Sequence, residues 1–367
     1  MKKTIIISII VITIIAIIAI MAKNNINSQK TSENNQSNKN NVEQKQTGKT
    51  SIKTTPSLED EIQTNTIWCG TFQLIWNDLK NKLAKQDIVF DPQMKVAQNL
   101  NKETFTEKDI SDKYYYKKIG TPSIALKEEI EKEILKKFNE KSDILDSFEW
   151  KGKTEEDYFL YAMLKKEFTF NKVFDEFENE KFGEYENIKY FGIKNGEDEE
   201  QRNQVKVLYY NSEDDFAIKL KTKQEDEVIL CKNPEGKTFN EIYLNIENKE
   251  KEFSGNKNIA KNEIVKIPNL NLNEIAEFSE IENKPFVFSN GDIYKIEKAM
   301  QTIKFELDKT GGKIKSEAGM MVTKQVLEIP TIKRNFILDD TFAIFLKEND
   351  KEKPYFAGKI SDITKFQ

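Results

Sequence analysis

A strand, a pair of glycines and a second potential strand follow one another over residues 303–325, and this order constrains the fold more than any other feature. Apolar and charged residues alternate from 303 to 307, so one face is apolar and the other is solvated. Gly311 and Gly312 then favour a bend or hinge. The alternation resumes after them, and one face of the second segment carries no charge: Gly312, Ile314, Ser316, Ala318, Met320 and Val322. The pattern fits a short hairpin, or a hinge followed by a segment able to lie against a core.

The chain contains no histidine among its 367 residues. This excludes Ser-His-Asp and Cys-His catalysis and every His-ligated metal site. Cys69 and Cys231 are too few for a Cys-only zinc site. They form either one disulfide or two buried thiols, and buried thiols are favoured because free cysteine behaves as a small hydrophobic residue. We find neither a phosphate-binding glycine loop nor a metal-ligand spacing, and we expect no cofactor and no metal.

The N-terminus predicts a membrane segment. Lys2 and Lys3 precede an apolar run over residues 4–22, and about 19 helical residues roughly span a bilayer core. Positive charge before the run places the N-terminal end in the cytoplasm and the rest of the chain outside. An uncleaved anchor over residues 1–22 is favoured over a cleaved signal peptide, because Ile20 is not the small residue preferred before a cut.

Residues 23–60 are rich in Asn, Ser, Gln, Lys and Thr, and they predict a disordered linker between the anchor and the domain. The remaining residues, 61–367, form the predicted folded domain and hold 49 Lys and Arg against 58 Asp and Glu. An acidic domain is a poor binder of nucleic acid, so we expect no nucleic-acid partner.

Within the domain, apolar periodicity predicts helices near 65–85 and over 123–139. Later segments have the pattern of strands separated by Asn, Gly and Asp turns, with one continuous apolar run fit for burial on both faces at 158–164. The other predicted strands lie at 186–193, 205–210, 216–220 and 227–231. The mixture predicts an α+β fold.

Five short motifs resemble the serpin family and occur in serpin order. Phe305-Glu-Leu-Asp-Lys-Thr-Gly311 resembles I-E-V-N-E-E-G, which leads from the fifth strand of the main serpin sheet into the reactive-loop hinge. Phe336-Ile-Leu-Asp-Asp-Thr-Phe342-Ala-Ile-Phe-Leu346 resembles F-x-A-D-H-P-F-x-F-x-I. The other three are similar to L-P-K-F, A-D-F-S-G-I and L-F-M-G-R-V, and they are Ile267-Pro-Asn-Leu270, Ala276-Glu-Phe-Ser-Glu-Ile281 and Tyr355-Phe-Ala-Gly-Lys-Ile360.

Weaker likenesses extend this pattern toward the N-terminus. The segment 65–74 resembles the first serpin helix, N-T-x-F-x-x-x-L. The segment 87–94 resembles N-V-F-S-P-L-S-I, which implies a short strand entering a buried helix.

The resemblance implies a serpin-like fold, in which helices pack on a large, mainly antiparallel sheet, with smaller sheets and an exposed reactive-centre loop at about 311–335. In inhibitory serpins a protease cuts this loop, which then inserts into the main sheet and traps the acyl-enzyme. The implied hinge consists of Gly311, Gly312, Ile314, Ser316 and Ala318. The implied scissile region, from the family's spacing, is Lys324, Gln325 and Val326. Lys324 would suit a Lys-cleaving protease.

The predicted function is therefore an extracellular inhibitor of a serine or cysteine protease, with no catalytic residues of its own. We expect it to be tethered through residues 1–22, or secreted if that segment is cleaved. We also expect a monomer, which can form loop-sheet polymers on warming because one molecule's loop can enter another's sheet.

Two alternatives stay open. A non-inhibitory serpin-fold surface protein that binds a partner or ligand is favoured by Lys309 and Thr310, which replace two glutamates, and by the altered hinge at 313–315. An unrelated surface enzyme or adhesin is the other alternative, for example a glycosidase that uses Asp214/Asp215 or Asp339/Asp340. Adjacent strand residues point to opposite faces, however, which favours surface or turn carboxylates.

Overall fold

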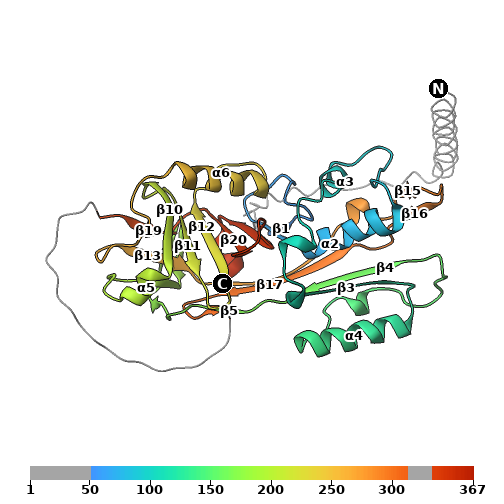
Figure 1. The fold of residues 1–367 in the computed structure, drawn as a ribbon, viewed down its shortest axis with the longest axis horizontal. Coiled ribbons are helices and arrows are strands. Elements are labelled where there is room, and N and C mark those ends of the chain that lie inside the picture. The colour runs from blue at the N-terminus through green and yellow to red at the C-terminus, as the bar shows by residue number, and fades with distance from the viewer. Residues whose placement is uncertain (1–50, 313–332) are drawn as a thin grey trace, which may run out of the picture. The chain divides into compact units, whose positions relative to one another are not determined.

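The computed structural model describes residues 51–312 and 333–367, which belong to one compact unit, Thr50–Gln367 (Figure 1). No helix within these described ranges is long and apolar enough to cross a membrane. The predicted anchor at 1–22 lies outside the described residues.

Residues 51–60, at the end of the segment predicted as a linker, belong to the compact unit. Strand β1 (Lys53–Thr54) pairs in parallel with β2 (Thr66–Cys69), and Leu58 is buried in the main hydrophobic core. The rest of the predicted linker lies outside the described residues.

The largest sheet has seven strands, and all its pairs except β1–β2 are antiparallel. In spatial order after β1 and β2 the strands are β21 (Phe356–Ile360), β20 (Phe342–Glu348), β12 (Asp226–Lys232), β11 (Asp215–Lys221) and β10 (Val205–Ser212). Every residue of β12 and of β20 is buried. These two strands therefore form the centre of the core, as expected for strands covered on both faces.

A four-stranded sheet and five strand pairs complete the β structure of the described residues. The four-stranded sheet has the order β19 (Asn335–Ile337), β13 (Ile264–Pro268), β9 (Tyr190–Ile193) and β6 (Asp175–Glu176), with β19 and β13 parallel. The pairs are β3 (Tyr115–Gly120) with β4 (Phe159–Leu164), β14 (Leu270–Glu277) with β17 (Met300–Leu307), β5 (Phe168–Thr169) with β18 (Gly311–Gly312), β7 (Glu180–Phe182) with β8 (Tyr185–Ile188), and β15 (Pro285–Val287) with β16 (Ile293–Lys295).

Five α-helices lie among the described residues: α2 (Thr71–Asp78), α3 (Lys95–Leu100), α4 (Ile124–Phe138), α5 (Glu199–Asn203) and α6 (Phe239–Glu252). A π-helical turn over Leu79–Ala84 continues α2. Short 3-10 turns occur at Glu107–Asp109, Asp112–Tyr114, Leu145–Ser147, Ser279–Ile281 and Ile363–Phe366. The predicted α+β class, with a large mainly antiparallel sheet and smaller sheets beside it, is confirmed.

Helix α4 confirms the helix predicted at 123–139, and its limits follow from the sequence. The Ser123 hydroxyl accepts a hydrogen bond from the Leu126 amide and caps the N-terminus. Asn139 ends the helix in the left-handed conformation. One helix face packs Leu126 and two isoleucines against the β3–β4 pair.

Two predictions near the N-terminus of the domain are only partly confirmed. The helix predicted over 65–85 begins only at Thr71, because residues 66–69 form β2, in which every side chain is buried within the seven-stranded sheet. Packing on both faces of this strand outweighs the helical spacing of its apolar residues. The short strand implied near residues 87–90 is also absent from the described structure, where helix α3 follows at Lys95–Leu100.

The predicted strands of the middle region are confirmed. Strand β4 begins one residue after the predicted start at 158, and β10, β11 and β12 match the predicted segments to within two residues at each end. The segment predicted at 186–193 forms two strands, β8 and β9. Burial of β4 on both faces is only partial, since several of its side chains are half-exposed.

Candidate functional site

Two strands, β4 and β17, each have one edge without a neighbouring strand that faces the same space. Strand β4 pairs along its length only with β3, and β17 pairs along its length only with β14. The free edges of β4 and β17 both line one large cleft, of about 1340 Å³, which we call the β4–β17 cleft. Backbone groups at such edges can pair with a further strand.

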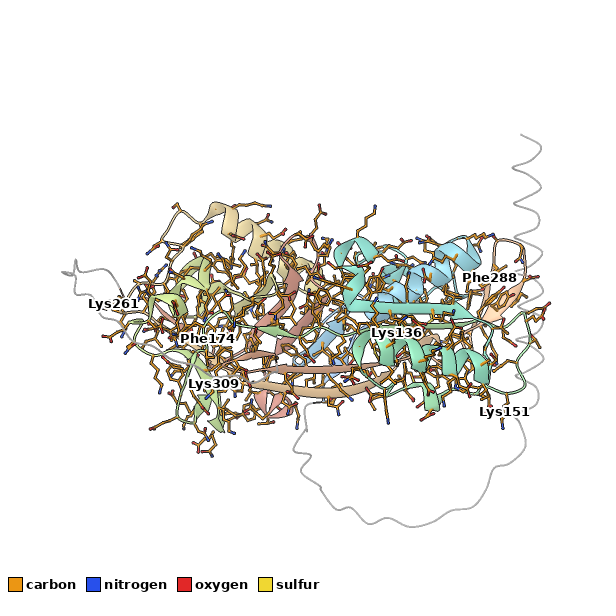
Figure 2. All side chains as sticks on the ribbon, turned by 60° about the horizontal axis from the view of Figure 1, so that its bottom comes forward. Lys136, Lys151, Phe174, Lys261, Phe288 and Lys309 are labelled. Carbon is orange, nitrogen blue, oxygen red and sulfur yellow. The ribbon has the colours of Figure 1, made fainter. Side chains whose placement is uncertain are left out.

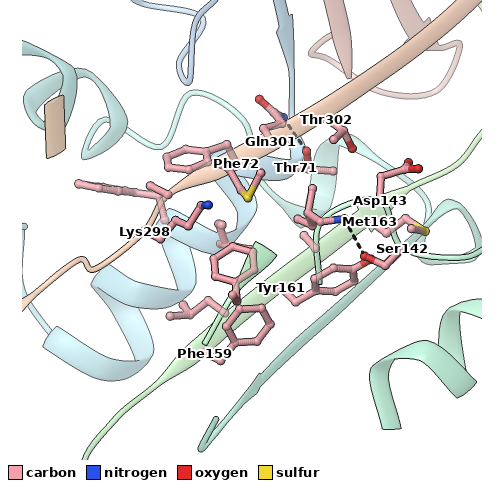
Figure 3. A pocket seen from close by; sticks show the side chains of 18 of the residues that line it. Thr71, Phe72, Ser142, Asp143, Phe159, Tyr161, Met163, Lys298, Gln301 and Thr302 are labelled. Atoms are coloured by element: carbon pink, nitrogen blue, oxygen red, sulfur yellow. Dashed lines mark hydrogen bonds between the residues drawn. The ribbon is translucent and has the colours of Figure 1, made fainter. Parts of the chain in front are cut away.

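Helix α2 lies at the cleft and contributes Phe72, Ile75 and Trp76 to its lining. Figure 3 shows Phe72 and Gln301 on one side, with Tyr161 and Met163 of β4 on the other. The polar Gln301 of β17 is buried here, and its amide nitrogen donates to the Thr71 hydroxyl (2.6 Å) and to the Cys69 carbonyl (3.0 Å). Its amide oxygen has no hydrogen-bond partner among the described residues.

The two faces of strand β4 pack against different hydrophobic clusters. Phe159 and Tyr161 pack with the residues beneath α4, whereas Leu160 packs with the cluster that contains Phe72 and Trp76 of α2. The α2 side is therefore the core side of the cleft, and the α4 side is its outer side. Figure 1 shows α2 and α4 beside the β3–β4 pair.

One end of the cleft is already closed by a short strand. The chain leaves β17 at Leu307, turns, and returns as β18, in which Gly311 pairs with Thr169 and Gly312 with Phe168 of β5. Gly311 also forms an antiparallel bridge with Asp308, with hydrogen bonds of 3.2 Å and 3.1 Å in the two directions. At this end a strand therefore lies between the continuations of β17 and β4.

Glycine is required at position 311. The residue has φ +121°, and an added Cβ would lie 2.5 Å from the Phe168 carbonyl oxygen. The turn before it is fixed by Asp308, whose carboxylate accepts hydrogen bonds from the amide (2.8 Å) and hydroxyl (2.6 Å) of Thr310. A residue with a side chain at position 311 would separate the two pairing strands.

The residues just before the glycines are held to the same edge. The amides of Phe170 and Phe174 each donate a 3.0 Å hydrogen bond to the carbonyls of Thr310 and Lys309, respectively. The Lys309 ammonium pairs with Glu176 at 2.6 Å. Figure 2 shows Phe174 and Lys309 in the same region of the molecule.

Exposed ion pairs join the two sides of the cleft on its outer side. Lys304 of β17 pairs with Asp143, which follows α4, at 2.8 Å. Lys153, which precedes β4, pairs with Glu297, which precedes β17. Single pairs of this kind contribute little to stability because solvent screens them, but both must rearrange if a chain passes between these sides.

Arg334, directly before β19, is held by several hydrogen bonds. Its guanidinium binds both carboxylate oxygens of the buried Glu263, at 2.6 Å and 2.9 Å, and donates to the carbonyls of Asn256 and Asn258. Charge-assisted bidentate contacts are among the strongest hydrogen bonds in proteins. The chain is thus fixed beside β13 where β19 begins.

A buried cluster of charged groups lies at the closed end of the cleft. Lys166, between β4 and β5, contacts Asp226 of β12 and Glu348 of β20, each at 2.7 Å. Asp226 and Glu348 are opposite one another on the two neighbouring strands. Burial raises the pKa of Asp226 to about 6, although Lys166 opposes this. Burial also pushes the pKa of Glu348 upward, but hydrogen bonds from Lys166 and Ser111 outweigh it and leave that pKa lowered.

Of the predicted site residues, the structure describes Gly311 and Gly312 and brings both to the end of the cleft. The other predicted hinge residues, Ile314, Ser316 and Ala318, and the predicted scissile region, Lys324, Gln325 and Val326, lie outside the described residues. These positions stay predictions.

Both cysteines are free and buried, as favoured from the sequence. Three of the four carboxylates considered for a glycosidase are held in ion pairs. Asp214 and Asp339 both contact the Lys232 ammonium, and Asp215 contacts Lys249 at 3.0 Å. This is the arrangement of surface ion pairs.

Comparisons with known proteins return solved structures alone. No protein-family model matches the chain, and no curated protein matches it in sequence. Among the similar solved structures is Tengpin, a thermophilic serpin in the native state, with 12% identity, a TM-score of 0.48, and coverage of 83% of this chain and 90% of that chain. Serpin48, described as a highly specific serpin of the insect Tenebrio molitor, has 11% identity, a TM-score of 0.44, and coverage of 82% and 92%.

A third similar structure is thyroxine-binding globulin in complex with thyroxine, with 11% identity, a TM-score of 0.41, and coverage of 70% of this chain and 78% of that chain. Two of these similar structures are described as serpins, the family that the sequence motifs resemble. The sequence identities are near one tenth and the TM-scores are below 0.5.

Proposed function

We propose that this serpin-fold chain is an extracellular inhibitor of a serine or cysteine protease, and that its cut loop enters the β4–β17 cleft as a new strand. The observation that carries the proposal is the pairing of Gly311 with both Thr169 and Asp308. A strand already occupies the end of the cleft there, and the free edges of β4 and β17 continue beyond it.

The pairing of the two glycines fixes the register in which a longer strand would extend. Continued residue by residue, it sets Ser316, Ala318 and Met320 opposite Leu164, Ala162 and Leu160 of β4. Leu160 packs with the α2 cluster, so the alternating residues of β4 on its side belong to the core side of the cleft. The inserted segment would thus turn its uncharged face to the core, and its charged face, including Lys315 and Glu317, to the outer side.

The register also gives a physical driving force. An inserted strand would form backbone hydrogen bonds to two edges that lack a neighbouring strand, and it would bury apolar side chains over α2. Cutting the loop releases the segment from the constraint at Arg334, which holds the far end. The captured protease would then be displaced while it is still joined to the loop as an acyl-enzyme.

The test uses residues 51–367 as a soluble protein, mixed with a panel of serine and cysteine proteases and resolved on denaturing gels. We expect a complex of summed mass that survives boiling, and a released fragment that starts near Val326. The cut protein should melt at a much higher temperature than the intact one. Cutting within 313–332 without a stable complex and without this increase in melting temperature would contradict inhibition and support the partner-binding alternative.

A matched pair of variants tests the register itself. Ala318→Glu places a charge on the face that becomes buried, at a cost of several kcal/mol, and should convert the inhibitor into a substrate. Met321→Glu places the same charge on the outer face and should leave complex formation intact. Equal behaviour of the two variants would reject the register.

A further inference from the structure

The buried cluster at the closed end of the cleft consists of Lys166, Asp226 and Glu348. The insertion of a strand does not require these charged groups. The side chains of Lys166, Asp226 and Glu348 are 2%, 0% and 6% exposed, respectively. The three come from sequence positions far apart and meet between the edge of the cleft and the seven-stranded sheet. Together they place one amine and two carboxyl groups in a site that solvent hardly reaches.

The surroundings of the amine are aromatic. The Lys166 ammonium lies 3.8 Å from the centre of the Tyr114 ring and 5.1 Å from that of Tyr355. Condensation requires a neutral amine and a neutral carboxyl group, which the transfer of one proton from Lys166 to Asp226 across their 2.7 Å contact would supply. The raised pKa of Asp226, about 6 through burial, is consistent with this neutral form.

The two oxygens of Asp226 are placed differently. Oδ1 contacts the Lys166 ammonium at 2.7 Å and accepts a hydrogen bond from the Tyr355 hydroxyl at 3.3 Å. Oδ2 is buried and has no hydrogen-bond partner among the described residues. A buried oxygen without a partner is unfavourable, and its removal would relieve that cost.

Glu348 is placed to move a proton. One of its carboxylate oxygens lies 2.7 Å from the Lys166 nitrogen, and its carboxylate also accepts hydrogen bonds from the amide and hydroxyl of Ser111. These contacts hold its pKa low despite burial. It is therefore ionised and within reach of the amine, as a general base must be.

We propose that Lys166 and Asp226 condense to an intramolecular amide bond, with Glu348 as the proton acceptor. The neutral amine attacks Cγ of Asp226 and the Nζ–Cγ bond forms. Glu348 takes one proton from Nζ and passes it to Oδ2, which also carries the proton that Lys166 gave to the carboxyl group. The Cγ–Oδ2 bond breaks, and Oδ2 leaves with these two protons as one water molecule. The product keeps Oδ1 as the amide oxygen, still hydrogen-bonded by Tyr355. No oxidant, metal or cofactor is consumed.

Such a bond would join the strand edge of the cleft covalently to β12 in the centre of the seven-stranded sheet. The edge that receives a new strand would then stay fixed to the core while the other side of the cleft moves. The fixed edge matters for insertion only under the proposed function, but the bond itself does not depend on that function, because the cluster exists whether or not the loop inserts.

The test is mass spectrometry of digested full-length protein. We expect a branched peptide that joins the segments around Lys166 and Asp226, lighter than the two separate peptides by one water molecule. Recovery of the two segments as separate, unmodified peptides would overturn the proposal. The Lys232–Asp339 pair, with the same 2.7 Å contact but an Asp339 side chain that is 48% exposed, is the internal control and should be unlinked.

Two variants separate the chemistry from the fold. Glu348→Gln keeps the amine and the carboxyl group but cannot accept the proton, so its peptides should be unlinked, and linkage at the wild-type level would reject Glu348 as the acceptor. Lys166→Arg keeps the positive charge without a nucleophilic amine. A loss of one water that persists in this variant would place the linkage elsewhere. If either variant fails to fold, the wild-type digest alone decides the proposal.

Discussion

The seven-stranded sheet and the two pairs that border the cleft use their strands in opposite ways. Each inner strand of the large sheet has a neighbour on both sides, and β12 and β20 are buried throughout. In contrast, β4 and β17 each have one edge without a neighbouring strand and several half-exposed residues. The first region has already formed its backbone hydrogen bonds, whereas the second keeps unused hydrogen-bonding groups. Substitutions should therefore act on stability in the first region and on conformational change in the second.

The largest expected effect is in the complete sheet. Phe345 of β20 is fully buried and lies edge-on to Phe239 and Tyr243 of α6. Phe345→Ala should lower the free energy of unfolding by about 3–5 kcal/mol. The matched cleft variant Leu160→Ala, at a half-exposed position, should lower it by only about 1 kcal/mol. Chemical denaturation measures both, and equal losses would contradict the contrast between the two regions.

The next effect concerns the closed end of the cleft. Gly311→Ala forces a side chain into φ +121° and against the Phe168 carbonyl, and it should cost about 1–3 kcal/mol. Gly152 also has a positive φ, of +70°, but an added Cβ there meets nothing within 4 Å. Gly152→Ala should therefore cost about 1 kcal/mol or less. If the two variants unfold at the same denaturant concentration, the close approach of β18 to β5 does not determine how much stability the substitution at position 311 costs.

A smaller effect on stability, with a kinetic consequence, is expected for Lys304. Lys304→Ala removes the exposed pair with Asp143 and should cost no more than about 0.5 kcal/mol. After the loop is cut, however, the gain in thermal stability should appear faster, because one contact across the outer side of the cleft is gone. Lys181→Ala removes an exposed pair with Glu186 in the β7–β8 hairpin and should leave that rate unchanged. A rate equal to that of the wild type in Lys304→Ala would show that the pair does not restrain insertion.

The smallest effect is chemical. Burial raises the pKa of the Cys231 thiol to about 11 and also raises the pKa of Cys69. The reactive thiolate is therefore scarce at pH 8, and the native protein should react slowly with a thiol reagent and show two thiols after denaturation. Raising the pH from 8 toward 10 should speed the native reaction. Fast labelling at pH 8 without denaturant would indicate that the cleft, which Cys69 lines, opens spontaneously.

Local patterns predicted the elements that depend on local sequence. Helix α4 has its cap at Ser123 and its apolar stripe within one segment, and β10 to β12 alternate or are uniformly apolar between turns. Strand β2 was missed because it is defined by pairing along its two edges with β1 and β21, and β21 is distant in sequence. The spacing of its apolar residues carries no sign of that contact.

The sequence pattern singled out Gly311 and Gly312, which pair with β5, but it did not indicate the cleft. The cleft exists because β4 and β17 do not pair, and nothing in either segment indicates a missing neighbour. The buried charges were also missed, since Lys166, Asp226 and Glu348 all flank apolar runs, where a charge is usually solvated. A signal was present in the conjunction of a lysine and two acids at the ends of buried strands. Only the fold shows that these ends meet.

The short β18–β5 pair has one consequence for association between molecules. Because Gly311 and Gly312 already lie at the end of the cleft, a strand that extended from them would meet the cleft of its own molecule at an effective concentration on the order of millimolar. A loop from a second molecule competes only when the protein concentration approaches that level, or when the β18–β5 pair opens. Dilution should therefore favour insertion of the loop into the cleft of its own molecule. A high protein concentration or heating should favour insertion between molecules, which gives polymers.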